Sequence, residues 1–199
     1  MKEQQIKLLV KKEELTIDEV KEILDYIVNN VKSKLDINDS STRLCKESSM
    51  FISNLCNKLE IPYIPFSMGE IGMGEMEHHF GITGFNTEHG QICFLLDLTY
   101  IQFIEKTYPI NLKNVKGVKH VYSPGTFISD ELKYQLVNSR YMTLTDKNFE
   151  EYISGFIESY KMANPIDERL VYDKSYELLE NYGINLVSND YLNDIGKTY

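Results

Sequence analysis

Two β-rich runs on either side of a short turn constrain the fold most strongly. FGITGF (residues 80–85) and QICFLLDLTYIQF (residues 91–103) flank the turn-like sequence NTEHG (residues 86–90). Runs of β-branched and aromatic residues around Asn and Gly are typical of a β-hairpin. We therefore expect an antiparallel hairpin whose second strand extends to Phe103.

Helical periodicity predicts one helix, and the start of a second, before the hairpin. Thr16 is placed as an N-cap, and Glu19 closes a capping box in front of a single apolar stripe. A second helix is expected to begin within a residue or two of Cys45, after the cap-forming cluster DINDSST (residues 36–42). Residues 60–76 contain two prolines and three glycines and are expected to form a loop.

The second half of the chain alternates between helical and strand patterns. Residues 107–125 are expected to be irregular or short-stranded, and SDELKYQLVNS (residues 129–139) to be helical. YMTLT is expected to begin with a short strand, after which Thr145 caps another helix carrying Phe149, Tyr152, Ile153 and Phe156. A last helix is expected to have Gly183 at its C-cap. Helices outside a small antiparallel sheet make an α+β fold.

Composition and charge argue against several classes of function. The net charge of -9 and the pI near 5.0 are unlike those of nucleic-acid-binding proteins, which need clustered Lys and Arg. No stretch of about 18 apolar residues occurs, so no membrane span is expected. Charges interrupt the apolar residues of MKEQQIKLLVKKEEL, which therefore lacks the apolar core of a signal peptide. We expect a cytoplasmic location, or delivery by a route that needs no signal peptide.

Three cysteines cannot all pair within one chain, and none lies at the CxxC spacing of zinc or redox sites. Cys56 lies on an apolar helical stripe and Cys93 lies within a strand, so both are expected to be small buried hydrophobic residues. Cys45 differs because it follows the cap cluster. At the first turn of a helix, free backbone N–H groups and the positive end of the dipole favour the nucleophilic thiolate.

The hairpin is expected to bring a histidine to an aspartate. In an antiparallel hairpin the start of the first strand lies across from the end of the second, so His78 or His79 meets Asp97. A carboxylate can orient an imidazole that exchanges a proton with a thiol. Two other interpretations stay open: the histidines can be surface residues or, with Glu75 and Glu77, metal ligands. Asp97 can instead serve only to start a turn.

The residues around Cys45 and along the hairpin resemble the papain-like and transglutaminase-like superfamily. There a Cys opens the central helix and small residues follow on its inner face, as Ser48 and Ser49 do in CKESSMFISNLCNKLEIP. HHFGITGF is similar to the His-x-Phe strand, and LLDLTYIQF to the Asp-x-Thr-Tyr-x-Gln-Phe strand, of bacterial papain-fold toxins and effectors. GTFISDELKYQLVNSRYMTLTDKNFEEYISGF is similar to the downstream region of bacterial members, so the resemblance covers roughly residues 45–156.

Carried over position by position, the resemblance implies a Cys-His-Asp triad. Cys45 corresponds to the nucleophile and Asp97 to the group that orients the histidine. The His-x-Phe spacing selects His78, because Phe80 follows it by two residues and lies on the same strand face. His79 is expected to point to the opposite face.

One departure from the family pattern concerns the oxyanion site. Leu44 stands where members often have Gly or Asn before the Cys. The main-chain N–H of Cys45 can supply one oxyanion donor, and Asn38 is a candidate for the second. Tyr100 and Gln102 match the end of the family's second strand and are expected to be structural supports.

The resemblance implies a papain-like α+β fold in which an N-terminal catalytic helix packs on a small antiparallel sheet with additional helices. One domain is expected over residues 1–199, with a catalytic core at residues 36–156. Residues 1–35 and 157–199 are expected to be N-terminal and C-terminal helical extensions, which can cover the cleft or bind a partner.

The function implied is that of a thiol-dependent amide hydrolase or acyltransferase that forms a thioester, foremost a protein glutamine deamidase. A cysteine protease and a transglutaminase-type acyltransferase share the same acyl-enzyme step. A catalytically inactive papain-fold binding module is a further alternative. The expected partners are a protein or peptide substrate and a regulatory or substrate-presenting protein, with no cofactor.

Overall fold

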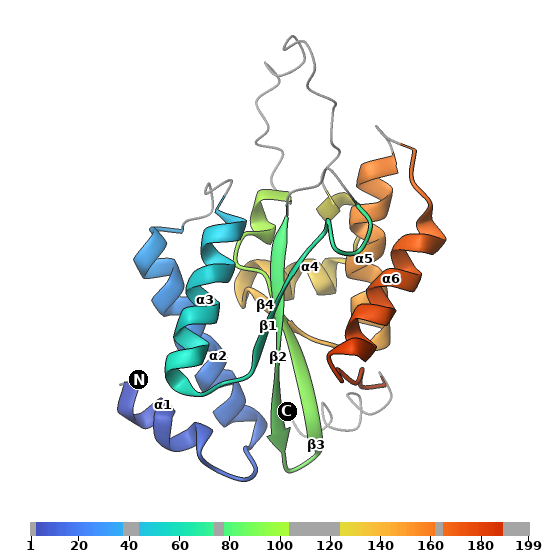
Figure 1. Cartoon of the computed structure of the whole chain (residues 1–199). Helices are drawn as coiled ribbons and strands as arrows, with labels where there is room; N and C mark the ends of the chain where they lie inside the picture. The colour runs from blue at the N-terminus through green and yellow to red at the C-terminus, as the bar shows by residue number, and fades with distance from the viewer. Residues whose placement is uncertain (1–2, 38–43, 74–77, 104–123, 162–164, 189–199) are drawn as a thin grey trace.

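The computed structural model describes residues 3–37, 44–73, 78–103, 124–161 and 165–188 (Figure 1). Within these ranges six α-helices and one four-stranded sheet form the predicted α+β arrangement. The helices are α1 (Glu3–Val10), α2 (Ile17–Leu35), α3 (Cys45–Leu59), α4 (Asp130–Asn138), α5 (Asp146–Lys161) and α6 (Glu168–Asn181). The strands are β1 (Tyr63–Ser67), β2 (His79–Thr87), β3 (Gly90–Leu96) and β4 (Tyr141–Thr143). None of these helices has the length and apolarity needed to cross a membrane.

The sheet is antiparallel throughout, with the strand order β1-β2-β3-β4. Its centre is the predicted hairpin, in which Gly81 of β2 pairs with Leu96 of β3. Residues 60–76 were expected to be loop throughout, but Tyr63–Ser67 form the edge strand β1. Pro65 lies within β1 opposite Gly81, and a proline is tolerated there because an edge strand has one side without ladder hydrogen bonds.

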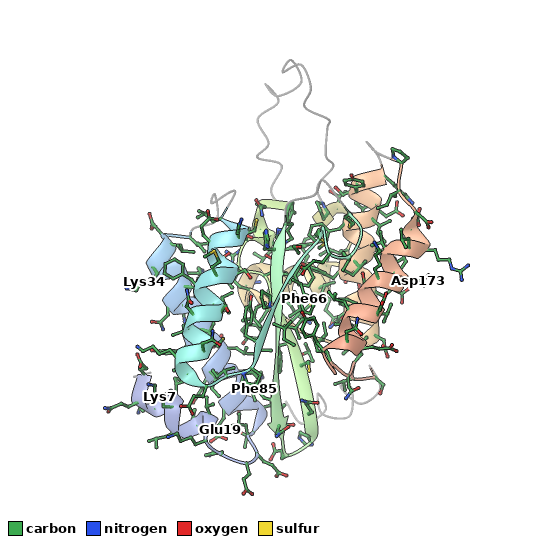
Figure 2. All side chains as sticks on the ribbon, in the orientation of Figure 1. Lys7, Glu19, Lys34, Phe66, Phe85 and Asp173 are labelled. Carbon is green, nitrogen blue, oxygen red and sulfur yellow. The ribbon has the colours of Figure 1, made fainter. Side chains whose placement is uncertain are left out.

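Helices cover both faces of the sheet and enclose two hydrophobic cores. In Figure 1, α1, α2 and α3 lie on one side of the sheet and α5 and α6 on the other, and the buried residues of α4 belong to the same core as those of α5 and α6. Phe85 belongs to the core beneath α2 and α3, and Phe66 to the core beneath α5 and α6. Figure 2 shows both rings inside the molecule, while the charged side chains of Lys7, Glu19 and Asp173 lie at its periphery.

The helix boundaries follow the predicted capping residues. Thr16 and Glu19 form a complete capping box at the start of α2, as predicted. The Thr145 hydroxyl accepts a hydrogen bond from the Asn148 N–H at the start of α5. Gly183 lies just after α6 with a φ of 64°, a conformation that glycine adopts without strain.

The second strand of the hairpin is shorter than predicted. β3 ends at Leu96, and Tyr100–Phe103 forms the 3-10 helix η1 instead of more strand. The Asp97 side chain accepts hydrogen bonds through Oδ1 from the backbone N–H of Thr99 at 3.1 Å and its hydroxyl at 3.3 Å. These local bonds favour a turn over a continued strand. Of the stretch 107–125, predicted to be irregular or short-stranded, residues 107–123 lie outside the described residues, and Pro124–Thr126 forms a 3-10 helix, η3.

Candidate active site

Three elements meet at one end of the sheet, each contributing one polar side chain. Cys45 is the first residue of α3, His78 immediately precedes β2, and Asp97 immediately follows β3. In Figure 1 the start of α3 and the start of β2 lie at the same end of the molecule. The hairpin register explains the other contact, because Gly81 opposite Leu96 puts the residues just before β2 beside those just after β3.

The imidazole of His78 is held by the carboxylate of Asp97. Nε2 of His78 lies 2.6 Å from Oδ2 of Asp97, and both side chains are buried, with exposed fractions of 1% or less. His79 is half-buried and pairs with Ser67 across the ladder between β1 and β2. The structure therefore joins His78, and not its neighbour, to the aspartate.

Cys45 lies close enough to the same imidazole to contribute to its raised pKa. Nε2 is bonded to Asp97, so Nδ1, which has no hydrogen-bond partner within the described residues, is the nitrogen left to face the thiol. Cys45 is 7% exposed. His78 is thus bonded to a carboxylate through one ring nitrogen and has a thiol nearby.

The electrostatics of the site favour the charged form of His78. Burial lowers the pKa of His78, because a charged imidazolium loses its hydration. The charge and hydrogen bond of Asp97, with a further contribution from the hydrogen bond and charge of Cys45, outweigh burial and raise the pKa from 6.5 to about 9. At neutral pH His78 is therefore mainly an imidazolium.

Aromatic side chains enclose the His78 ring. The Phe156 ring stacks on it with centroids 5.2 Å apart and an interplanar angle of 21°. The Phe103 ring meets it edge-on at 4.8 Å. Phe80 and Ile82, which follow His78 at intervals of two residues, are buried in the same core. This apolar enclosure keeps water from His78 and strengthens its interactions with Asp97 and Cys45.

Asp97 accepts four hydrogen bonds from described groups. Its Oδ1 takes the two bonds from Thr99, and its Oδ2 takes one from the His78 ring and one from the Tyr152 hydroxyl at 2.8 Å. These four donors compensate the buried carboxylate for the loss of its hydration. Tyr152 lies on α5 and was predicted only as a residue of an apolar helical stripe.

The residues that follow Cys45 on the inner face of α3 are buried and have small side chains. Ser48 and Ser49 are 3% and 5% exposed, as the resemblance implied for the inner face of this helix. The Ser48 hydroxyl donates to the carbonyl of Leu44 at 2.7 Å, and the Ser49 hydroxyl lies 3.2 Å from that of Tyr63 on β1. Leu44 makes no side-chain hydrogen bond to the first turn of α3. Among the described residues, Leu44 therefore offers no side-chain cap that would compete with an oxyanion for the N–H groups of this turn.

The other two thiols are in apolar surroundings. Cys56 is 0% exposed and Cys93 is 3% exposed, which confirms the prediction that both are buried. Burial raises the pKa of the Cys56 thiol to about 12 and that of Cys93 to about 11. Neither is a nucleophile at neutral pH.

Three predicted candidates lie outside the described residues: Asn38, Glu75 and Glu77. Among the residues that the structure describes, no group of three or more His, Cys, Asp or Glu is arranged to hold a metal ion. The described part of the site consists of side chains suited to proton transfer and nucleophilic attack.

Comparison with known proteins finds no match for this chain among protein-family models, curated proteins or solved structures. The resemblance to the papain-like superfamily therefore stays a prediction. The arrangement of Cys45, His78 and Asp97 has to be interpreted from its own chemistry.

Proposed function

We propose that the protein is a thiol-dependent amide hydrolase or acyltransferase with a papain-like site, in which Cys45 is the nucleophile, His78 the general acid and base, and Asp97 the orienting group. The observation that carries the proposal is that His78 is bonded to Asp97 and has the Cys45 thiol nearby. A nucleophile beside a base that is itself oriented by a third group is the arrangement that covalent catalysis requires.

The proposed reaction begins with the ion pair between the Cys45 thiolate and the His78 imidazolium. The thiolate sulfur attacks the carbonyl carbon of a carboxamide, and a carbon–sulfur bond forms as the carbonyl π electrons move to oxygen. Collapse of this intermediate breaks the carbon–nitrogen bond, and His78 Nδ1 gives its proton to the departing nitrogen. Ammonia leaves, and the acyl group remains on Cys45 as a thioester.

Water then resolves the thioester. His78, now neutral, takes a proton from the water through Nδ1 as the oxygen attacks the thioester carbon. The carbon–sulfur bond breaks, the thiolate returns and a carboxylic acid is released. Throughout, Asp97 holds Nε2 and stabilises the positive charge on the ring.

We favour a glutamine side chain of a protein as the substrate, because the resemblance extends to bacterial effectors of which many are glutamine deamidases. Peptide-bond cleavage and transfer to an amine use the same thioester and differ only in the leaving group or the acceptor. We place the reaction in the cytoplasm, on a protein or peptide substrate, with a regulatory or substrate-presenting protein as a second partner.

The test is turnover of a glutamine-containing peptide, with ammonia release and the intact mass of the protein as readouts. The wild type is expected to release ammonia and to carry the acyl mass on Cys45 after rapid acid quenching. Cys45→Ala is expected to abolish both signals without altering the circular dichroism spectrum, while the matched variant Cys56→Ala keeps them. Equal turnover in the wild type and in Cys45→Ala would reject the proposal.

A binding module without catalysis is the second candidate, favoured by the 7% exposure of Cys45. A thiol so well covered can serve packing as well as attack. This candidate predicts no ammonia release by the wild type, no thioester and slow alkylation of Cys45. The rate of alkylation therefore separates the two functions before any substrate is known.

A further inference from the structure

We infer that Tyr152 is a positioning residue of this site: its hydroxyl holds Oδ2 of Asp97 and limits how tightly that oxygen binds the His78 ring. The Tyr152 hydroxyl donates to Oδ2 at 2.8 Å, and His78 Nε2 lies 2.6 Å from the same oxygen. Two donors thus share one acceptor. The inference rests on the proposed function and adds a residue to it that belongs to none of the three predicted positions.

Packing fixes the place of the Tyr152 ring. The side chain is fully buried on α5, and its ring lies 5.4 Å from Phe80, 5.5 Å from Tyr100 and 5.1 Å from Phe156 between centroids. Because the ring is enclosed on several sides, its hydroxyl has a single position relative to Asp97. Burial first, and then the charge of Asp97, raise the pKa of Tyr152 well above 10, so the hydroxyl remains a donor throughout the neutral range.

The sharing of Oδ2 has a chemical consequence for His78. A carboxylate oxygen that accepts a second strong hydrogen bond is a weaker partner for the first donor. An imidazolium held too tightly is a weaker acid and delivers its proton to a leaving group less readily. The Tyr152 hydroxyl therefore keeps the His78 proton transferable while Asp97 still orients the ring.

Tyr100 supplies a matched control from the same cluster. It is 0% exposed like Tyr152, and its ring lies 5.5 Å from that of Tyr152. Within the described residues, however, its hydroxyl makes no hydrogen bond. Tyr100→Phe and Tyr152→Phe both delete one buried hydroxyl, but only the second deletes a bond to Asp97. Among the described residues, the titratable groups that interact with His78 or Asp97 are Cys45 on α3, Tyr63 on β1, Tyr100 on η1 and Tyr152 on α5.

The experiment is an NMR titration of the His78 imidazole in the full chain, compared among the wild type, Tyr152→Phe and Tyr100→Phe. Tyr152→Phe is expected to raise the pKa of His78 by about half a pH unit or more, because Oδ2 then serves His78 alone. The same variant is expected to lower kcat and to move its pH profile to higher pH. Tyr100→Phe is expected to leave the His78 titration at its wild-type position.

A second variant tests the sign of the effect and does not depend on loss of the hydroxyl. Replacement of Tyr152 by 3-fluorotyrosine keeps the ring and makes the hydroxyl a stronger donor, so the pKa of His78 is expected to fall. The inference is overturned when neither variant moves the His78 titration, or when both move it in the same direction. The titration does not require catalytic activity. If the wild type is inactive but the variants shift the His78 pKa as expected, the proposed function is rejected, while the role of Tyr152 in holding Asp97 is retained.

Discussion

Nε2 of His78 and Oδ2 of Asp97 lie 2.6 Å apart although 19 positions separate the two residues in the chain. The β2–β3 hairpin makes this contact, because one residue precedes its first strand and the other follows its second. Both side chains are almost fully buried, so each depends on the other for compensation of its charge. The contact between His78 and Asp97 therefore contributes to the stability of the fold and also takes part in the proposed chemistry.

The first prediction concerns stability against pH. The folded-state pKa of His78 is raised above its ordinary value of 6.5 to about 9. The stabilising contribution is therefore fully present below pH 6.5 and is lost as the pH rises through about 9. At 1.36 kcal/mol per pH unit, the full contribution is at most ~3 kcal/mol.

Urea denaturation at pH 6, 8 and 10 measures this dependence. The wild type is compared with His78→Gln, which cannot titrate at this position. The difference in unfolding free energy between the two proteins is expected to shrink as the pH rises from 6 to 10. A difference that stays constant over this range would contradict the assignment of a charged, buried His78.

The second prediction concerns the charge of Asp97, which Asp97→Asn removes while nearly keeping the size and shape of the side chain. Asparagine can keep a contact to Thr99 through its carbonyl oxygen but removes the negative charge next to His78. We expect the pKa of His78 to drop below its wild-type value and turnover to fall on the order of 10² to 10⁴-fold. Asp130→Asn is the matched control, because the Asp130 side chain is fully exposed at the start of α4. NMR titration and steady-state kinetics give the two readouts.

The third prediction concerns the close approach of Tyr63 to β2. A Cβ atom at Gly81 would overlap the hydroxyl end of the Tyr63 ring, which is wedged between β2 and Ser49 of α3. Gly81→Ala is expected to lower the unfolding free energy by about 1–3 kcal/mol. The control is Gly69→Ala, whose Cβ would meet, among the described residues, only the Ser67 hydroxyl at an ordinary contact distance of 3.8 Å.

A shortened side chain at position 63 tests the cause of that loss. Tyr63→Leu removes the part of the ring that a Cβ at Gly81 would meet. The double variant Gly81→Ala/Tyr63→Leu is expected to lose less stability than the sum of the two single variants. If the losses of unfolding free energy in the two single variants simply add up in the double variant, the overlap with Tyr63 is not the cause of the loss in Gly81→Ala. Thermal or chemical unfolding measures these values.

Features set by local chemistry were predictable from the sequence. The capping box of Thr16 and Glu19 and the turn between β2 and β3 depend on residues a few positions apart, and both form as expected. The start of α3 at Cys45 followed from the polar cluster before it. Hairpin topology predicted that His78 or His79 meets Asp97, and the His-x-Phe spacing of the resemblance selected His78.

β1 was not predictable, and the end of β3 was foreseen only as the alternative in which Asp97 starts a turn, because non-local or side-chain interactions override the local patterns. The prolines of residues 60–76 indicated a loop, yet β1 forms because β2 offers it a partner and because an edge position tolerates Pro65. The run after Leu96 has the composition of a strand. The hydrogen bonds between Asp97 and Thr99 turn the chain at that point.

Tyr152 was not predictable as part of the site, because 55 positions separate it from Asp97. Its spacing with Phe149, Ile153 and Phe156 identified only a buried helix face, which the structure confirms. One signal was present in principle: a buried tyrosine hydroxyl needs a hydrogen-bond partner, unlike the phenylalanines around it. The sequence did not indicate which acceptor that would be.

The rate at which iodoacetamide alkylates Cys45 at pH 7 is a direct test of whether His78 activates this thiol, with each cysteine followed by peptide mass spectrometry. We expect modification confined to Cys45, because burial keeps the thiols of Cys56 and Cys93 protonated. We also expect a rate on the order of 10-fold or more above that of His78→Gln, in which no imidazolium favours the thiolate. Equal alkylation rates of Cys45 in the two proteins would show that His78 does not activate it.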